Sequence, residues 1–243
     1  MRQKEGKTPR VVVVMPAYNA AKTLKKTYHD LPHQLIHKVI VVDDASSDDT
    51  SKIASSLRLE VQTHAENLGY GGNQKTCYTL ALQAGADIIV MLHPDYQYDA
   101  TLIPDLIKPI SDDRADIMLG SRIRSRREAL EGGMPLYKYV SNRTLTIFEN
   151  IVFGLSLSEY HTGFRAFARR ALTRIPFQKL SNDFVFDQQI IFEAIARGFR
   201  IGEIAVPVRY FEEASSINFS RSLWYGLSTV YHSLRYAAKG RYQ

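Results

Sequence analysis

Val39-Ile-Val-Val-Asp-Asp-Ala-Ser-Ser-Asp-Asp-Thr50 begins as an apolar run of mostly β-branched residues and ends in two carboxylates followed by small, turn-forming residues. This pattern predicts a buried strand that stops at Asp43 and Asp44. In open parallel sheets, ligands bind in the crevice beyond the carboxyl ends of the strands. The two aspartates therefore lie where we expect a binding site.

Two further segments repeat this design. Val11-Val-Val-Val-Met15 runs into Pro16-Ala-Tyr-Asn19, and Asp87-Ile-Ile-Val-Met-Leu92 runs into His93-Pro-Asp-Tyr-Gln-Tyr-Asp99. An ordinary loop between a strand and a helix would account for one such strand end. Three buried strands that deliver polar groups at the same end indicate a shared site.

Strand and helix patterns alternate along the chain with short connections, which predicts an α/β fold of right-handed βαβ units around a mostly parallel sheet. Further strands are expected at 59–63, 115–119 and 200–210, and helices at 20–30, up to Ala54, at 75–84, from 102 onward, at 137–153 and at 183–197. Pro207 indicates that the last strand lies near a sheet edge. Asp48 or Asp49 is expected to cap the second helix, and Thr101 the helix that begins near Leu102.

Composition narrows the class of protein. The 243 residues, of which 45% are hydrophobic and 23% charged, suit one α/β domain. No segment approaches the roughly 18 uninterrupted apolar residues of a spanning helix, and we expect no secretory signal because residues 1–8 have no apolar core. The single cysteine, Cys77, excludes an internal disulfide framework and fits a reducing cytoplasm. The net charge of +6 suits phosphate-rich ligands or an anionic membrane surface, and no nucleic-acid-binding motif accompanies it.

Five short motifs follow one another between residue 11 and about residue 210. They are Met15-Pro-Ala-Tyr-Asn19, Val42-Asp-Asp-Ala-Ser-Ser-Asp-Asp-Thr50, Asn67-Leu-Gly-Tyr-Gly-Gly72, Pro94-Asp-Tyr-Gln97 and Thr162-Gly-Phe-Arg165. In this order they make the chain resemble the family 2 glycosyltransferases, and among them the dolichyl- and polyprenyl-phosphate sugar synthases. The resemblance implies a GT-A fold, a Rossmann-like, mostly parallel sheet flanked by helices. We expect a flexible N-terminus at 1–9, the GT-A domain at 10–215 and a C-terminal amphipathic helix at 216–243.

The resemblance also implies that the first half of the chain binds the nucleoside of a UDP- or GDP-sugar donor. Carried over by position, the nucleotide-binding residues are Pro16, Ala17, Tyr18, Asp43, Asp44, Asn67 and Gly69. A core aromatic is the alternative interpretation of Tyr18. The glycines of 67–72 permit positive φ and close approach of a ligand, although glycine clusters of this kind are mostly simple turns.

The family usually carries Asp-x-Asp with Gln two residues further on, and it uses the motif to bind a divalent metal that bridges the diphosphate. Here the corresponding residues are His93, Asp95 and Gln97, so histidine replaces the first aspartate. The resemblance implies Mn²⁺ or Mg²⁺ as cofactor, with Asp95 as the best candidate ligand. Because imidazole suits transition metals better than Mg²⁺, His93 either ligates Mn²⁺ or forms a hydrogen bond nearby. Asp99 is expected to be a surface acid close to a helix.

The second half of the chain is expected to face the acceptor. By resemblance, Arg165, Arg209 and Gln97 bind it, with the two arginines as phosphate clamps, and Asp187 is an acid that faces it. The expected catalytic residues are Asp187, Asp95 and Arg165. For a sugar hydroxyl, Asp187 would be a general base, whereas a polyprenyl phosphate is already largely ionised at pH 7. Asp187 is alternatively a first-turn acid of its helix.

Two other segments leave alternatives open. The basic stretch at 120–135, with Arg122, Arg124, Arg126 and Arg127, is either a solvated loop or a lid over the diphosphate. The C-terminal segment carries an apolar stripe at helical spacing, formed by Leu223, Trp224, Leu227, Val230, Tyr231 and Leu234. Its helix either docks on the core or lies at a lipid interface.

These observations predict a cytoplasmic, metal-dependent glycosyltransferase that acts with inversion on a polyprenyl or dolichyl phosphate, at the cytoplasmic face of the membrane if the C-terminal helix is interfacial. Inversion is implied by the resemblance alone. One alternative is transfer to a sugar hydroxyl in cell-surface polysaccharide synthesis. The other, prompted by His93, is a protein that binds nucleotide sugars without turnover.

Overall fold

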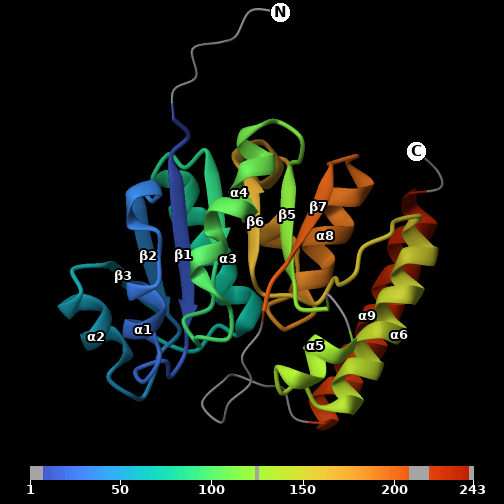
Figure 1. Ribbon diagram of the computed structural model, residues 1–243, viewed down its shortest axis with the longest axis horizontal. Helices are drawn as coiled ribbons and strands as arrows, with labels where there is room; N and C mark the ends of the chain where they lie inside the picture. Colours follow the sequence, from blue (N-terminus) through green and yellow to red (C-terminus); the bar gives the residue numbers. More distant parts are fainter. Residues whose placement is uncertain (1–7, 124–125, 208–218, 241–243) are drawn as a thin grey trace, which may run out of the picture.

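The computed structural model describes residues 8–123, 126–207 and 219–240. Within these residues one mixed sheet has the strand order β3-β2-β1-β4-β6-β5-β7 (Figure 1). Its strands are β1 (Val11–Ala17), β2 (Lys38–Asp43), β3 (Glu60–Thr63), β4 (Ile88–Met91), β5 (Ile117–Ser121), β6 (Arg165–Ala168) and β7 (Ile201–Ala205). The α/β class with a mostly parallel sheet is confirmed.

Strand direction changes at β6. β1 pairs in parallel with β2 and β4, β2 with β3, and β5 with β7, whereas β6 is antiparallel to both β4 and β5. The sequence analysis did not predict β6, which is only four residues long. β7 forms a sheet edge, as Pro207 indicated, but it ends at Ala205, and residues 208–210 of the expected strand lie outside the described residues.

The helices connect and cover the strands. They are α1 (Leu24–His29), α2 (Thr50–Ser56), α3 (Tyr70–Gln83), α4 (Ile103–Ser111), α5 (Arg126–Glu131), α6 (Leu136–Phe153), α7 (Arg169–Leu172), α8 (Phe186–Ala196) and α9 (Phe219–Gly240), with short 3₁₀ turns η1 (His33–Leu35), η2 (Ala100–Leu102) and η3 (Phe177–Lys179). Asp48 Oδ1 accepts a hydrogen bond from Thr50 N at the start of α2. The cap expected at Thr101 is wrong, because Asp99 accepts a hydrogen bond from Thr101 N and begins η2.

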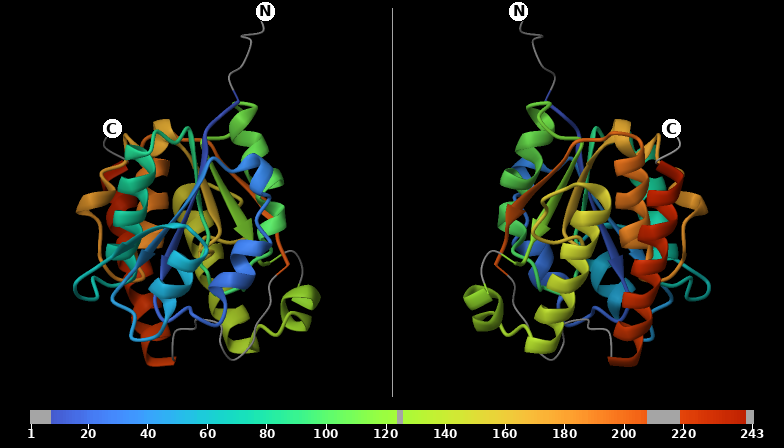
Figure 2. Two further views of the ribbon diagram at one scale, coloured as in Figure 1. Left: turned by 90° about the vertical axis from the view of Figure 1, so that its left-hand side faces the viewer. Right: turned by 90° about the vertical axis from the view of Figure 1, so that its right-hand side faces the viewer.

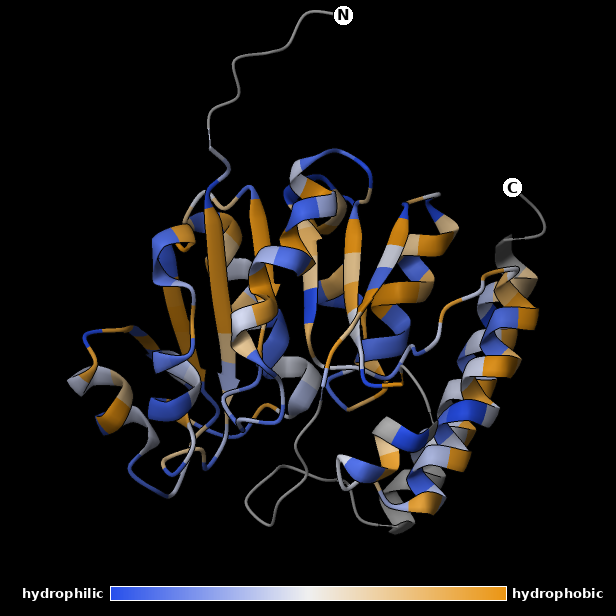
Figure 3. Ribbon diagram, in the orientation of Figure 1, coloured by the Kyte–Doolittle hydropathy of each residue, from blue (hydrophilic) through white to orange (hydrophobic). Residues whose placement is uncertain are grey.

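The core lies on both faces of the sheet. Side chains of β1 alternate, so Val11, Val13 and Met15 face one hydrophobic cluster while Val12 and Val14 face the other. The first cluster includes residues of α1, α2 and α4, and the second includes residues of α3 and α8 (Figures 1 and 2). Burial on both faces explains why the strands are almost continuously apolar, as their colouring in Figure 3 shows.

α6 and α9 lie side by side beyond the β7 edge, and α9 also contacts α8 (Figure 1). α9 is oriented against the expectation for a core-docking helix. Thr229 and Ser233 on its inner face are fully buried, whereas Leu227, Tyr231 and Leu234 of the predicted apolar stripe are exposed. Tyr225 and Tyr236 also contact the protein, through His161 and Glu193, so docking uses polar and aromatic residues while Leu227, Tyr231 and Leu234 face outward. Among the described residues, no helix combines the length and hydrophobicity needed to cross a bilayer.

Candidate active site

The polar loops predicted from the sequence meet at the carboxyl ends of β1, β2 and β4. β1 lies between β2 and β4, so the strand order reverses there, and such a switch point opens a crevice for ligands. A pocket of about 670 Å³ occupies this crevice. The expected nucleotide-binding residues that line it are Pro16, Ala17, Tyr18, Asp44, Asn67 and Gly69. Tyr18 is 58% exposed, so the alternative interpretation as a core aromatic is wrong.

Asp44 organises one wall of this larger pocket. Its buried carboxylate accepts hydrogen bonds from Leu68 N (2.9 Å), Gly69 N (3.1 Å) and His64 Nδ1 (2.7 Å). Gly69 has a φ of +84°, and a Cβ there would lie 2.8 Å from the carbonyl oxygen of Asn182. The carboxylate and the glycine together fix the 67–69 loop beside the pocket.

Asp43 lies beside the larger pocket but does not line it. Its carboxylate accepts hydrogen bonds from the hydroxyl groups of Ser46 and Ser51, and its side chain is buried. Asp43 therefore shapes the loop between β2 and α2 in this structure. Its expected contact with the nucleotide stays a prediction.

Each of the three strand-end loops contains a non-glycine residue in the left-handed region. These residues are Asn19 after β1 (φ 52°), Ala45 after β2 (φ 57°) and Tyr96 after β4 (φ 61°). For alanine and tyrosine this conformation costs energy, and such positions cluster at ligand-binding and catalytic sites. Two more described non-glycine residues with positive φ, Arg58 and Asp113, follow α2 and α4, so the three strand-end positions agree with the site but do not establish it alone.

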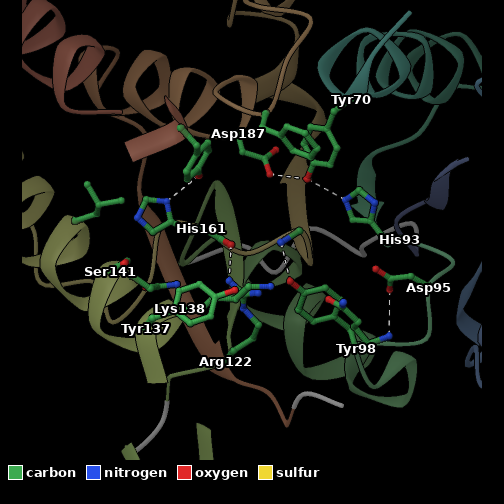
Figure 4. Close-up of a pocket in the computed structure, with 16 residues that line it drawn as sticks. Tyr70, His93, Asp95, Tyr98, Arg122, Tyr137, Lys138, Ser141, His161 and Asp187 are labelled. Atoms are coloured by element: carbon green, nitrogen blue, oxygen red, sulfur yellow. Dashed lines mark hydrogen bonds between the residues drawn. The ribbon is translucent and has the colours of Figure 1, made fainter. Parts of the chain in front are cut away.

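A second pocket, of about 220 Å³, adjoins the first (Figure 4). Tyr70, His93, Asp95, Phe184 and Tyr225 line both pockets, so the two meet at these side chains. The smaller pocket is also lined by Gln97, Tyr98, Arg122, Tyr137, Lys138, Ser141, Asn142, Leu145, His161, Gly163 and Asp187. Residues from both halves of the chain therefore surround the junction.

His93 and Asp95 are the candidate metal ligands at this junction. Burial lowers the pKa of His93 and outweighs the charge of Asp95, which raises it, so the neutral imidazole is favoured. Asp95 Oδ1 accepts a hydrogen bond from Gln97 N at 3.1 Å. Over residues 8–123, 126–207 and 219–240, no group of three or more His, Cys, Asp or Glu side chains is arranged to hold a metal. Two protein ligands nevertheless fit an ion whose remaining ligands are substrate phosphates and water.

Asp187 lines the smaller pocket from the first turn of α8. Its Oδ2 accepts a hydrogen bond from the Tyr70 hydroxyl (2.7 Å), and its Oδ1 accepts one from Gln74 Nε2 (3.0 Å) and lies 3.3 Å from Arg165 Nη1. Both carboxylate oxygens are therefore occupied by donors of the protein. Its role as a general base stays a prediction.

The structure corrects the expectation that Arg165 clamps the acceptor phosphate. Arg165 is fully buried and lines neither pocket. Its guanidinium donates to the carbonyl oxygens of Thr162 (2.6 Å), Asp187 (2.8 Å) and Tyr160 (3.2 Å). Arg165 is thus a structural cation that holds Asp187 and the 160–162 segment. The other expected clamp, Arg209, lies outside the described residues.

The cations of the smaller pocket come from the basic segment and from α6. Arg122 pairs with the fully buried Glu159 and donates to the carbonyl oxygen of His161 (2.6 Å). Lys138, at the start of α6, lines the same pocket. Arg127 pairs with Glu131 on the surface, and Arg124 lies outside the described residues.

Sequence reasoning missed Tyr70, Lys138, Glu159 and His161 as site residues. Tyr70 belongs to a motif that was noticed only for its glycines. His161 directly precedes the Thr162-Gly-Phe-Arg165 motif, and this position is the sequence signal that could have identified it as a site residue. His161 Nδ1 is bonded to the hydroxyl of Tyr225 on α9 (2.9 Å), and His161 Nε2 lies 3.1 Å from Glu149 of α6. This histidine therefore connects the pocket to both outer helices.

Comparisons with known proteins agree with the motifs. The sequence model of the family described as glycosyl transferase family 2 matches residues 12–175. The UDP-N-acetylglucosamine–dolichyl-phosphate N-acetylglucosaminyltransferase of Methanococcus voltae is 29% identical over 219 residues, covering 83% of this chain and 86% of that protein. The polyprenol monophosphomannose synthase of Mycolicibacterium smegmatis is 25% identical over 226 residues, covering 87% of this chain and 81% of that protein.

A solved structure supports the fold. Glucosyl-3-phosphoglycerate synthase from Mycobacterium tuberculosis, in complex with Mn²⁺, UDP-glucose and phosphoglyceric acid, is similar with a TM-score of 0.72 at 17% identity. The match covers 95% of this chain and 80% of that chain. The expected GT-A fold is therefore confirmed.

Proposed function

The chain belongs to glycosyl transferase family 2, and on this basis we propose that it is an inverting glycosyltransferase that moves one sugar from a nucleotide-sugar donor to a polyprenyl or dolichyl phosphate. In this proposal the larger pocket binds the donor and the smaller pocket binds the acceptor phosphate. The sugar is transferred where the pockets meet, beside Tyr70, His93 and Asp95. Inversion follows from the resemblance of the motifs.

A UDP- or GDP-sugar is the proposed donor. The larger pocket, at about 670 Å³, lies within the roughly 300–1,000 Å³ typical of small-molecule sites. The relative from Methanococcus voltae is named for UDP-N-acetylglucosamine, and the structure from Mycobacterium tuberculosis contains UDP-glucose. Both support a nucleotide-sugar donor for this chain.

Asp95 and His93 are the residues that would hold a divalent cation, Mn²⁺ or Mg²⁺. When bound, the cation supplies charge neutralisation for the departing diphosphate. Asp95 is held by the Gln97 backbone, and His93 by Tyr70. These contacts keep both side chains at the junction of the two pockets.

Lys138 carries the assignment of a phosphate acceptor, because the other charged side chains lining the smaller pocket have partners or, like Asp95, are assigned to the cation. Arg122 is already neutralised by Glu159, and Asp187 by Arg165. Burial, together with the positive charge of Arg122, lowers the pKa of Lys138. The Lys138 ammonium is therefore less stable here than in water, and the negative charge of a bound phosphate would stabilise it.

A phosphate acceptor also agrees with the surroundings of Asp187. A phosphate monoester is already largely ionised near pH 7, so its attack on the sugar needs no general base. The carboxylate of Asp187 accepts hydrogen bonds on both oxygens and sits beside the Arg165 cation. This arrangement favours a positioning role for Asp187 over proton abstraction.

We further propose that α6 and α9 rest on the membrane surface that holds the lipid. Exposed apolar side chains occur along both helices: Leu136, Val140, Ile147 and Ile151 on α6, and Leu227, Tyr231 and Leu234 on α9. The net charge of +6 favours anionic lipids. Replacing Ile151 and Leu227 by Glu should reduce sedimentation with anionic liposomes, whereas Leu35→Glu, an exposed leucine elsewhere, should not.

The experiment that tests the function incubates the full chain with a panel of UDP- and GDP-sugars, Mn²⁺ and either a short polyprenyl phosphate or free glycans. The expected product is a sugar linked to the lipid phosphate, with the anomeric configuration opposite to that of the donor by NMR. Transfer to glycans alone would identify a hydroxyl acceptor. Nucleotide-sugar binding without any transfer would identify a binding protein.

The variant Lys138→Gln tests whether the smaller pocket binds the acceptor phosphate. We expect the KM for the polyprenyl phosphate to rise about tenfold, because a charge-assisted hydrogen bond to phosphate is lost. The affinity for the nucleotide should stay unchanged. Lys179→Gln, at an exposed lysine that lines neither pocket, is the matched control. An equal KM in both variants would remove Lys138 from the acceptor site.

A further inference from the structure

The Tyr70 hydroxyl lies between the acidic residue of the acceptor side and the histidine of the metal-binding motif. Its oxygen is 2.7 Å from Asp187 Oδ2 and 3.2 Å from His93 Nε2. Figure 4 shows these two contacts at the junction of the pockets. Tyr70 therefore connects residues that are far apart in the sequence.

The chemistry of the three groups fixes the direction of both hydrogen bonds. A carboxylate only accepts, so the Tyr70 hydroxyl donates its proton to Asp187. The hydroxyl then has only lone pairs to offer His93, and Nε2 must donate to it. A tyrosine hydroxyl is protonated at neutral pH, so it is available to donate to Asp187. In the neutral ring, Nε2 carries the hydrogen and Nδ1 keeps its lone pair.

Packing fixes the orientation of the ring as well as its protonation. Tyr70 stacks on His93 with ring centroids 5.3 Å apart and an interplanar angle of 11°. A Cβ on Gly163 would lie 2.6 Å from His93 Cδ2 and 2.9 Å from His93 Nε2, so only glycine leaves room for this edge of the ring. The opposite edge, which carries Nδ1, therefore faces away from Gly163.

We propose that Tyr70 is a positioning residue that sets the tautomer and orientation of His93, so that Nδ1 presents its lone pair to a divalent cation also held by Asp95. This inference rests on the proposed function, in which such a cation accompanies the donor. A ligating histidine commonly donates its second ring nitrogen to a fixed acceptor, which sets the tautomer and raises ligand strength. The relay from Asp187 through Tyr70 supplies that acceptor. It also explains how histidine can stand where the family usually has aspartate.

The tautomer is tested in the metal-free protein, without any reaction. Long-range proton–nitrogen correlation spectra of the full chain with ¹⁵N-labelled histidine should show His93 with protonated Nε2 and bare Nδ1, and His93→Gln identifies the signal. Tyr70→Phe keeps the ring and removes the hydroxyl. We expect this variant to give a mixture of the two tautomers. A wild-type protein with Nδ1 protonated, or an unchanged tautomer in Tyr70→Phe, would overturn the proposal.

The consequence for the cation is measured by Mn²⁺ electron paramagnetic resonance in the presence of UDP. Tyr70→Phe should weaken Mn²⁺ binding about tenfold, in the range found when an outer partner of a metal ligand is removed. Tyr160→Phe is the matched control, because Tyr160 is a buried tyrosine that donates to Asn150 and lines neither pocket. Equal affinities in the two variants would overturn the proposal.

A double-mutant cycle separates this inference from the proposed function. In a His93→Ala background, Tyr70→Phe should have no further effect on Mn²⁺ affinity, because the two residues act through one another. If His93→Ala and Asp95→Ala both leave Mn²⁺ binding intact, the metal assignment of the proposed function fails. If His93→Ala weakens binding and Tyr70→Phe does not, only the role of Tyr70 fails.

Discussion

The half of the molecule proposed to bind the donor, β1 to β4, and the half proposed to bind the acceptor, β5 to β7 with α6, α8 and α9, build their pockets in different ways; they are called the donor side and the acceptor side below. On the donor side, the lining residues lie in loops directly after strands, and Asp44 is held by backbone amides of the nearby 67–69 loop. On the acceptor side, buried ion pairs join distant segments, as in Arg122–Glu159 and Arg165–Asp187. The first design uses backbone amides as partners of a buried carboxylate, and the second uses ion pairs in which both side chains must be present.

The two halves should therefore lose stability or activity through different substitutions. When the partners of a buried carboxylate are backbone amides, as for Asp44, a neutral acceptor can replace it without leaving a buried cation unpaired. A buried charge that loses its partner is left uncompensated, at a cost of about 3–5 kcal/mol. Substitutions on the acceptor side should therefore lower stability first, and those on the donor side should change binding or rate.

Asp187→Asn should have the largest effect on stability. Asparagine can accept on only one side, so its amide would face the Tyr70, Gln74 or Arg165 donors, and Arg165 would lose its counterion. We expect the free energy of unfolding to fall by about 3–5 kcal/mol in urea denaturation. The double replacement Asp187→Leu with Arg165→Met should recover part of this loss. Unchanged stability in the single variant would show that the Arg165–Asp187 pair does not stabilise the acceptor-side half.

Asp95→Ala should leave the fold intact and remove most of the activity. Asp95 lies at the junction of the pockets in the strand-end loop after β4, so its loss affects charge neutralisation more than packing. We expect kcat to fall by about 10²–10³-fold at saturating donor, with an unchanged urea midpoint. Asp105→Asn, at an exposed acid of α4, is the control. Normal turnover in Asp95→Ala would exclude it as a metal ligand.

Asp116 lies just before β5, at the end of the acceptor-side half that is away from the two pockets. Burial raises the pKa of its carboxyl, but hydrogen bonds and charge from Arg200 and Arg170 outweigh this and lower the pKa from 3.8 to about 2. A lowered pKa stabilises the fold above pH 3.8, and the contribution is lost as the pH falls through about 2.

The contribution of Asp116 amounts to about 2 kcal/mol. Asp116→Asn should therefore flatten the decline in unfolding free energy between pH 4 and pH 2, as measured by urea denaturation at each pH. Asp105→Asn serves again as control. A decline as steep in Asp116→Asn as in the wild type would show that other carboxyl groups cause it.

The smallest expected effect concerns the two aspartates of the donor side. Asp44 lines the larger pocket and orders the 67–69 loop, whereas the carboxylate of Asp43 is bonded to Ser46 and Ser51. Asp44→Asn should weaken UDP binding about tenfold, roughly 1.4 kcal/mol, by calorimetry. Asp43→Asn should weaken it less. The reverse order would mean that Asp43 turns towards the nucleotide on binding.

The same contrast explains how much the sequence could predict. On the donor side, strand ends, glycines and polar loops are adjacent along the chain, so the pocket could be located from residues 15–19, 42–50, 67–72 and 94–97. Expectations for the acceptor side depended on single residues whose contacts are made by other segments of the chain. Arg165 was expected to contact the acceptor because its motif resembles that of the polyprenyl-phosphate enzymes, whereas its burial depends on carbonyl groups at Tyr160, Thr162 and Asp187.

Other failures have equally physical causes. β6 is four residues long and antiparallel, which is too short for a periodic pattern. Lys138 lines the pocket because the first half of α6 forms one of the pocket's walls, which its sequence does not reveal. The apolar stripe of α9 was recognised, but hydrophobic periodicity does not reveal whether a stripe faces the core or the outside, and here Leu227, Tyr231 and Leu234 face out.

The exposed apolar side chains of α6 and α9 also determine how the purified protein behaves in solution. Side chains such as Ile151, which is 78% exposed, and Leu227, at 57%, leave apolar surface in contact with water along two adjacent helices. Sulfate or phosphate salts strengthen association of such surfaces. A purified sample should therefore self-associate as its concentration rises, and a short-chain detergent below its micelle concentration should disperse it.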